Sequence, residues 1–189
     1  MKTILNLILI ITLFSSSKIH SQDLIPLKVN NEWTYLEKII TNNKVKIDTI
    51  TSKVEKTVTY NNKEWFFLNE LGDDFIVRND ELGHHELDTL TTLKNGNYDE
   101  VLIFKNFKKN KSTSYDIYDD VKVTKAAGIF KIETPIGKFK CRKYSLTFEF
   151  NNFNEVIEFY FTPKIGLIYY KWIEEETTTT CELINYKLE

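Results

Sequence analysis

Short runs of alternating apolar and polar residues recur along the chain from Glu32 to its end. Clusters of Asn, Asp, Gly and Pro interrupt these runs at intervals of about ten residues, which is the spacing of meandering antiparallel strands. A helical period of three or more turns is found nowhere in the sequence. The pattern therefore predicts a mainly β protein with little helix. We expect a single-domain antiparallel meander of about ten strands, forming a curved sheet, an open barrel or a sandwich.

The expected strands follow from these runs and breaks. A first strand begins at Trp33 and Tyr35, and a second continues from Val45 through positions 50, 54, 58 and 60 on one face. Further strands are expected at residues 64–71, 75–78, 84–90, 101–107, 117–125, 129–134, 138–150, 155–161, 167–173 and 181–188.

Some runs carry more information than others. The run 138–150 is expected to be the longest strand, with Tyr144, Leu146, Phe148 and Phe150 on one face. The run 167–173 is apolar on both faces, which favours a place in the middle of the sheet. Asn95 and Gly96 form the strongest hairpin signal, and the Thr-rich segment 174–180 is expected to be a link.

The first residues have the order of a secretory signal. Lys2 precedes the apolar run Ile4 to Phe14, and the small polar residues Ser15 to Ser17 follow it. Cleavage after Ser21 would leave residues 22–189 as a single all-β domain. The apolar run is too short to span a bilayer comfortably and no second one follows it, so a retained anchor is the less favoured alternative.

The signal predicts export to the periplasm or the extracellular space as a soluble protein. No Cys lies near the signal, so we do not expect a lipoprotein, nor an integral membrane segment after cleavage. Removal of Lys2 and Lys18 leaves 23 of the 25 basic residues against 27 acidic ones, which disfavours a nucleic-acid partner. The 13 Phe, 10 Tyr and 3 Trp residues favour sheet over helix.

Two cysteines, Cys141 and Cys181, allow two interpretations. In an oxidising compartment they could form one disulfide, provided that their Cα atoms come within about 7 Å. They could equally be two separate thiols buried as small apolar groups. The sequence leaves both alternatives open.

Few residues suggest chemistry. His84 and His85 are neighbours in an expected strand, so they should point to opposite faces, and a solvated turn is a better interpretation than a metal site. A GxSxG elbow and a Gly-rich phosphate loop are both missing from the sequence. We therefore expect no metal and no cofactor.

Pairs of acids are the remaining catalytic candidates. Asp73 with Asp74, and Asp119 with Asp120, are the pairs considered, because glycoside hydrolysis needs two suitably spaced carboxyl groups. Adjacent acids at strand ends are more often solvated turn residues. An extracellular hydrolase that uses paired carboxylates is thus the alternative function.

Three stretches together resemble a family of exported bacterial proteins, common in Bacteroidetes, largely of unknown function and labelled TapB-like. They are Pro26 to Tyr35, Thr134 to Cys141 and Tyr160 to Tyr169. The resemblance implies a fold rather than a reaction. Family members tend to have Gly where this chain has Asn30 and Lys164; Asn tolerates a left-handed turn, whereas Lys suggests a different local path.

The favoured function is a noncatalytic exported β domain that binds a partner or an apolar, lipid-like ligand. Its late strands carry more aromatic side chains than one sheet face needs, and open barrels can hold an acyl chain on such a surface. The predicted ligand-binding residues are Phe148, Phe161, Tyr170 and Trp172. The expected partner is an apolar small molecule or a cell-envelope protein, and an enzyme is the less favoured alternative.

Overall fold

The computed structural model describes residues 23–92, 97–107, 110–150 and 153–189. These residues form thirteen antiparallel strands and no helix, which confirms the predicted mainly β class. The strands are β1 Glu32–Thr41, β2 Lys44–Tyr60, β3 Lys63–Glu70, β4 Asp73–Asn79, β5 Gly83–Thr92, β6 Tyr98–Lys105, β7 Thr113–Tyr118, β8 Val121–Lys125, β9 Phe130–Thr134, β10 Gly137–Phe150, β11 Phe153–Thr162, β12 Gly166–Glu174 and β13 Thr177–Lys187.

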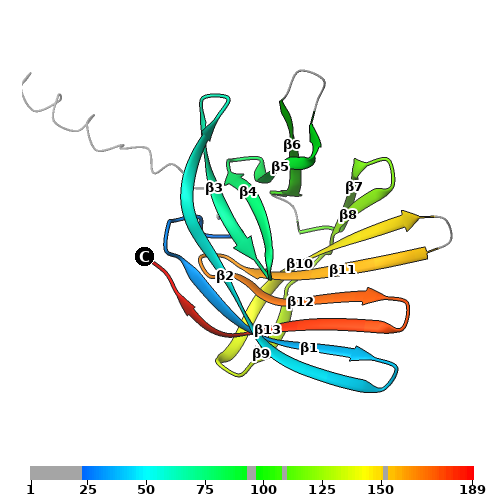
Figure 1. Cartoon of the computed structure of the whole chain (residues 1–189). Helices are drawn as coiled ribbons and strands as arrows, with labels where there is room; N and C mark the ends of the chain where they lie inside the picture. The colour runs from blue at the N-terminus through cyan, green and yellow to red at the C-terminus, as the bar shows by residue number, and fades with distance from the viewer. Residues whose placement is uncertain (1–22, 93–96, 108–109, 151–152) are drawn as a thin grey trace, which may run out of the picture.

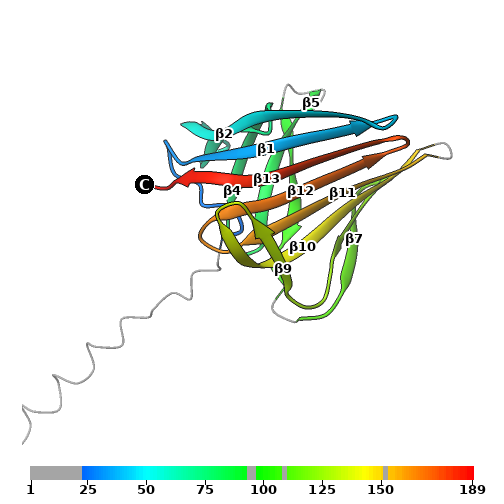
Figure 2. The same ribbon diagram turned by 90° about the horizontal axis from the view of Figure 1, so that it is seen from below.

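One strongly curved sheet contains all of these strands. Its order is β6-β5-β4-β3-β2-β1-β13-β12-β11-β10-β8-β7, and β9 pairs with the first half of β10. Strands β1, β13, β12, β11 and β10 lie side by side as one wall, and β3 to β6 curl round to face them (Figures 1 and 2). The result is a nearly closed barrel, one of the forms that the sequence predicts.

Side chains rather than a strand ladder join the two end strands, β6 and β7. The Tyr115 hydroxyl on β7 donates to the carbonyl of Ile103 on β6 at 2.6 Å and accepts from the N–H of Lys105 at 2.9 Å. The Tyr144 hydroxyl on β10 donates to the Lys105 carbonyl at 2.9 Å. An unpaired sheet edge leaves backbone groups without hydrogen-bond partners. The two tyrosine hydroxyls supply partners to the backbone of β6 in place of a strand ladder.

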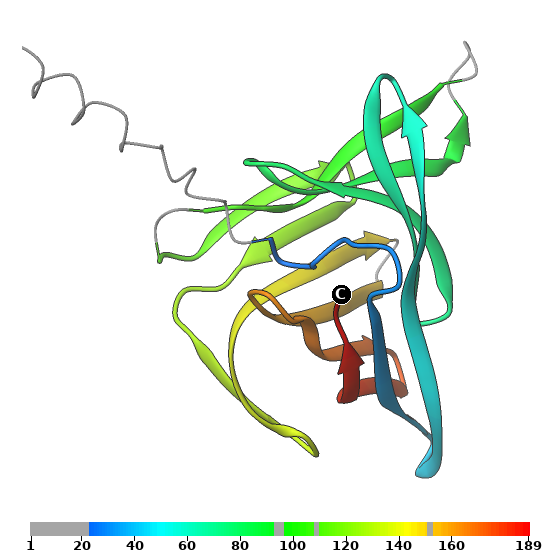
Figure 3. The same ribbon diagram turned by 90° about the vertical axis from the view of Figure 1, so that its left-hand side faces the viewer.

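The segment before β1 fills one end of the barrel. Figure 3 shows this segment, in blue, crossing between the strands of β3 to β6 and those of β10 to β12. Leu24 and Ile25 are buried there, and the Asn79 side chain donates to the Ile25 carbonyl at 2.7 Å. Asn31 ties both termini together, because it donates to the Pro26 carbonyl and accepts from the Glu189 N–H.

Two of the three stretches that resemble the TapB-like family pack against each other. The Trp33 indole N–H donates to the Ile165 carbonyl at 2.5 Å, and the Tyr35 hydroxyl donates to the Leu167 carbonyl at 3.2 Å. A Cβ at Gly166 would lie 3.4 Å from Trp33 Nε1, so a larger residue would crowd this contact. The motifs are thus structural.

Turn residues in these stretches adopt the left-handed conformation. Asn30 has a φ of 73° and Lys164 a φ of 72°. The expectation that Lys164 follows a different local path from Gly is therefore wrong. The surrounding contacts of Ile165 and Gly166 hold the turn in place although Lys has a Cβ.

Several strand boundaries differ from the prediction. Strand β2, not β10, is the longest, and a bulge between Val54 and Lys56 reverses its facing. Val54 consequently pairs with Leu68 but Val58 pairs with Trp65, so positions 54 and 58 lie on opposite faces instead of one. The alternation rule fails there because the extra residue breaks its period of two.

Two other boundaries were also wrong. The predicted strand 117–125 is two strands, β7 and β8, joined by Asp119 and Asp120. The Thr-rich segment expected to be a link mostly belongs to β13, which begins at Thr177, in keeping with the β propensity of Thr. Strand β12 lies between β11 and β13, as its two apolar faces predict. The Asn95–Gly96 turn and the signal segment lie outside the described residues.

No helix long and apolar enough for a membrane span is found among the residues that the structure describes.

Replacing Tyr115 by Phe should lower the free energy of unfolding by about 1 to 3 kcal/mol, because two backbone groups of β6 lose their partner. Urea unfolding followed by far-ultraviolet circular dichroism measures this change. Tyr186→Phe, on a half-exposed ring of β13, is the matched control and should change stability by less than about 0.5 kcal/mol. Equal stability of both variants would contradict closure through Tyr115.

Candidate functional site

A cavity of about 350 Å³ occupies the part of the barrel away from the N-terminal segment. Its first wall comes from β3 to β6 and the β3–β4 turn, with Glu70, Leu71, Phe75, Val77, Glu86 and Ile103. The facing wall comes from β10 to β12, with Leu146, Phe148, Ile157, Phe159, Tyr170 and Trp172. Asp73 and Tyr118, which are exposed, also line it, so the cavity meets solvent there.

The alternation of strand residues explains why these side chains meet. Phe148, Leu146 and Tyr144 are every second residue of β10, and Trp172 pairs with Ile157 across β11 and β12. Each strand therefore sends the same parity of residues inward. The interior is solid where these residues are large and tightly packed. A cavity remains where they do not fill the space.

A layer of aromatic rings forms the floor of the cavity. Phe104 lies at its centre, with ring centroids 5.2 Å from Tyr144, 5.2 Å from Phe159 and 5.1 Å from Phe161. These edge-to-face contacts favour close packing of the rings. The floor separates the cavity from the filled end of the barrel, where Trp33 and Tyr35 are buried.

The predicted ligand-binding residues divide between cavity and floor. Phe148, Tyr170 and Trp172 line the cavity. Phe161 does not line it; its ring is 1% exposed and packs in the floor beneath. The structure therefore brings all four to one region but gives Phe161 a packing position.

The sequence analysis missed two carboxyl groups, Glu70 and Glu86, in the cavity wall. Burial and the charge of Glu86 raise the pKa of Glu70 from 4.5 to about 7. Burial and the charge of Asp88 raise the pKa of Glu86 to about 7 as well. One signal could have found Glu70, because it continues the inward parity of Phe66 and Leu68 on β3.

Among the residues that the structure describes, no Lys or Arg side chain lines this cavity to offset the two carboxylates. The titratable groups that face them are Asp73 on β4, His84 and Asp88 on β5, Tyr118 on β7 and Tyr170 on β12. An isolated carboxylate among apolar groups is costly, and therefore both acids hold their protons to higher pH.

His84 and His85 point to opposite faces of β5, as the alternation predicts. His84 lines the cavity, and burial together with the charge of His85 lowers its pKa to about 3. His85 faces the outer side of the sheet. Both rings are buried, with 4% and 5% exposure, so the expectation of a solvated turn is wrong. On the outer face His85 lies between Asp80 and Glu100, an arrangement that sequence alternation alone cannot reveal.

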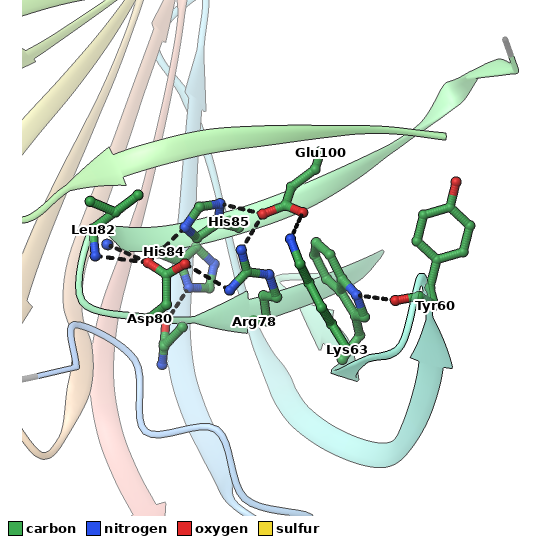
Figure 4. Close-up of polar contacts among 11 residues, drawn as sticks. Tyr60, Lys63, Arg78, Asp80, Leu82, His84, His85 and Glu100 are labelled. Carbon is green, nitrogen blue, oxygen red and sulfur yellow. Dashed lines mark hydrogen bonds and ion pairs between the residues drawn. The ribbon is translucent and has the colours of Figure 1, made fainter. Parts of the chain in front are cut away.

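His85 belongs to a charged network on that outer face (Figure 4). Its Nε2 lies 2.9 Å from Asp80 Oδ1 and its Nδ1 lies 2.9 Å from Glu100 Oε1. Arg78 bridges the same two acids, and Lys63 donates to Glu100 at 2.6 Å. Asp80 contacts Arg78 and His85, and Glu100 contacts Lys63, Arg78 and His85, so the network has a structural role.

A contact with an aromatic ring and a lowered pKa also mark the network. The Arg78 guanidinium lies 5.2 Å from the ring of Trp65, which is fully buried. Burial alone would raise the pKa of Asp80, but hydrogen bonds from His85 and Arg78 outweigh it and lower that pKa to about 2. In the described part of the chain, no group of three or more His, Cys, Asp or Glu side chains is placed to hold a metal ion.

The cysteines are two free, buried thiols. Cys141 lies on β10, with its sulfur 3.3 Å from the Thr162 hydroxyl. Cys181 lies on β13, and strands β11 and β12 lie between β10 and β13 in the sheet. The structure therefore does not contain the disulfide that was one of the two alternatives. Burial raises the pKa of both thiols, which makes them poor nucleophiles.

The predicted acid pairs do not form a catalytic pair. Asp119 and Asp120 make up the β7–β8 turn, and Asp74 accepts from the Asn69 side chain at 2.8 Å. Asp73 alone of these four lines the cavity. The other acids of the cavity are Glu70 and Glu86, in a wall that is mostly apolar.

No protein-family model and no curated protein matches this chain. Two solved structures are similar to it. One is a proposed lipoprotein of Parabacteroides distasonis, with a TM-score of 0.49 and 13% identity, covering 88% of this chain and 99% of its own. The other is a proposed exported protein with a YmcC-like fold of Bacteroides fragilis, with a TM-score of 0.49 and 12% identity, covering 87% and 98%.

Both neighbours come from Bacteroidetes and are described as exported proteins or lipoproteins. The assignment to the TapB-like family stays a prediction.

The Glu70 and Glu86 carboxyl groups should make stability fall as pH rises. Each folded-state pKa lies above 4.5, so between pH 4.5 and 7 the folded protein binds more protons than the unfolded chain. Between pH 5 and pH 8 the free energy of unfolding of the original protein should fall. In the double variant Glu70→Gln/Glu86→Gln this fall should be smaller by about 2 to 4 kcal/mol. Urea unfolding at both pH values measures the difference.

His84 has the opposite effect, since its lowered pKa makes stability rise with pH, but it is present in both proteins and cancels. Glu133→Gln, on the exposed surface of β9, is the matched control. Its free energy of unfolding should change between pH 5 and pH 8 by the same amount as that of the original protein. If the double variant lost as much stability as the original, the carboxyl groups would not be buried as described.

Proposed function

We propose that this chain is an exported binding protein that holds an apolar, lipid-like ligand inside its barrel. The observation that carries the proposal is the cavity of about 350 Å³ between the β3–β6 wall and the β10–β12 wall. This volume is at the lower end of the range of small-molecule sites, about 300 to 1,000 Å³. An alkyl chain or a small ring system suits it better than a protein segment.

The lining supports an apolar ligand. Phe75, Phe148, Phe159 and Trp172 present rings to the cavity, and Leu146 and Ile157 present aliphatic side chains. Apolar surface left open to water costs about 25 cal/mol per Å², so a ligand that covers it gains free energy. The aromatic floor is already packed, so a ligand would not have to reorganise it.

The location follows from the sequence. Residues 1–21 have the order of a secretory signal, so we place the binding domain, residues 22–189, in the periplasm or the extracellular space. An apolar compound needs a protein carrier in water, which gives a cavity of this kind a use there.

The hydrolase alternative has weaker support. Glu70 and Glu86 lie in one cavity with raised pKa values, as a general acid would. Sugar recognition, however, needs several hydrogen-bonding side chains beside the acids, and most of the lining is apolar. We therefore favour binding.

A neutral apolar dye, N-phenyl-1-naphthylamine, should bind the purified protein and gain fluorescence. Ile157→Trp fills the cavity with a larger side chain and should weaken dye binding by about tenfold or more. Ile129→Trp, on an exposed position before β9, is the matched control and should bind like the original protein.

Circular dichroism and thermal unfolding confirm that each variant is folded. Native mass spectrometry of protein purified from its own host should in addition show a bound mass. The proposal would be contradicted if Ile157→Trp bound the dye as tightly as the original protein, or if the original protein bound no dye.

A further inference from the structure

Several polar groups of the cavity can accept hydrogen bonds. Glu70, Asp73 and Glu86 are acceptors when ionised, and His84 lies in the same wall. His84 is 96% buried, since its exposure is 4%, so its ring has little access to water. Which ring nitrogen of His84 carries the proton therefore decides whether the ring donates or accepts a hydrogen bond in the cavity.

The neighbours of His84 define which nitrogen carries the proton. Asn79 Nδ2 donates to the Ile25 carbonyl at 2.7 Å, so Asn79 Oδ1 is the side that faces His84. His84 Nδ1 lies 2.9 Å from this oxygen and must donate to it. A neutral imidazole that donates from Nδ1 has a lone pair on Nε2, which makes His84 an acceptor toward the cavity.

The donors of the lining are already engaged, with one exception. The Trp172 indole N–H donates to Glu155, and the Tyr118 hydroxyl has a hydrogen bond with Asp88. The Tyr170 hydroxyl remains as a donor. Within the described part of the chain, neither Lys nor Arg lines the cavity.

We infer that the ligand of this cavity is an amphiphile with an apolar body and a primary amine head, which donates to Glu70, Glu86 and His84. The inference rests on the proposed function, because it names the class of ligand for the same cavity. An ammonium group supplies three donors and one positive charge, and therefore satisfies acceptors that the protein leaves unpaired.

The surroundings favour this head group over others. A fatty acid would bring a further carboxylate next to two acids, and a phospholipid would bring a phosphate without a cation to receive it. The rings of Tyr170 and Trp172 on the facing wall add attraction for a cation. Ammonium binding would also favour the ionised form of both glutamates, whose pKa values burial now raises.

The test compares four amphiphiles of one chain length below their micelle concentrations at pH 7.5: dodecylamine, dodecanol, dodecanoate and a lauroyl lysophosphatidylethanolamine. Tryptophan fluorescence follows binding, because Trp172 lines the cavity. Dodecylamine should bind about tenfold or more tighter than dodecanol, and dodecanoate should bind most weakly.

In Glu70→Gln/Glu86→Gln, the preference for dodecylamine over dodecanol should fall to about threefold or less. Far-ultraviolet circular dichroism and thermal unfolding show that this variant is folded. Glu133→Gln, on the exposed β9 surface, should keep the full preference.

The outcomes separate the two proposals. If none of the four compounds binds, the proposed function fails. If dodecanol or dodecanoate binds as tightly as dodecylamine, or the double variant keeps the preference, the cavity binds apolar ligands but the amine inference is overturned. Binding of the lysophospholipid as tight as that of dodecylamine would overturn it too, since phosphate would then be accepted.

Discussion

Closure of the curved sheet through tyrosine hydroxyls is the constraint on which the interior depends. Strands β6 and β7 meet at the ends of the sheet without a ladder, and Tyr115 satisfies the backbone groups between them. Tyr144 reaches the same edge from β10. Because these side chains come from inside the barrel, closure and core packing are one arrangement. The apolar faces of both walls are therefore enclosed rather than exposed on an open sheet.

The enclosed space is divided into a solid end and a hollow end. The segment before β1 and the rings of Trp33 and Tyr35 fill the first, and the aromatic floor around Phe104 bounds the second. Close packing stabilises the barrel at the solid end. The hollow end holds Glu70 and Glu86, whose pKa values burial raises, and such groups are more typical of functional sites than of a core.

The charged groups on the two faces of β5 differ in how far neighbouring groups of opposite charge compensate them. His85 on the outer face lies between Asp80 and Glu100, which Arg78 and Lys63 also contact. His84, one residue earlier, lines the same cavity as Glu70 and Glu86, and the described residues of this lining include no Lys or Arg. The outer network is balanced and structural, whereas the inner group is unbalanced and suited to a charged partner.

Alternation and turn residues by themselves determined the fold class, most strand positions and the central place of β12. They did so because inward and outward side chains alternate with a period of two, and because Asn, Asp and Gly tolerate tight turns. The aromatic excess also pointed to the region of Phe148, Tyr170 and Trp172.

Only the tertiary structure decided which inward residues pack and which line a cavity. Phe148 and Phe161 look alike in the sequence, yet curvature places one at the wall and the other in the floor. The bulge in β2 turns Val58 to the opposite face, and His85 is buried on the outer face between Asp80 and Glu100. Glu70 and Glu86 meet across β3 to β5 through the register of separate strands. Such long-range pairings depend on how the whole sheet closes, and local residue patterns do not contain them.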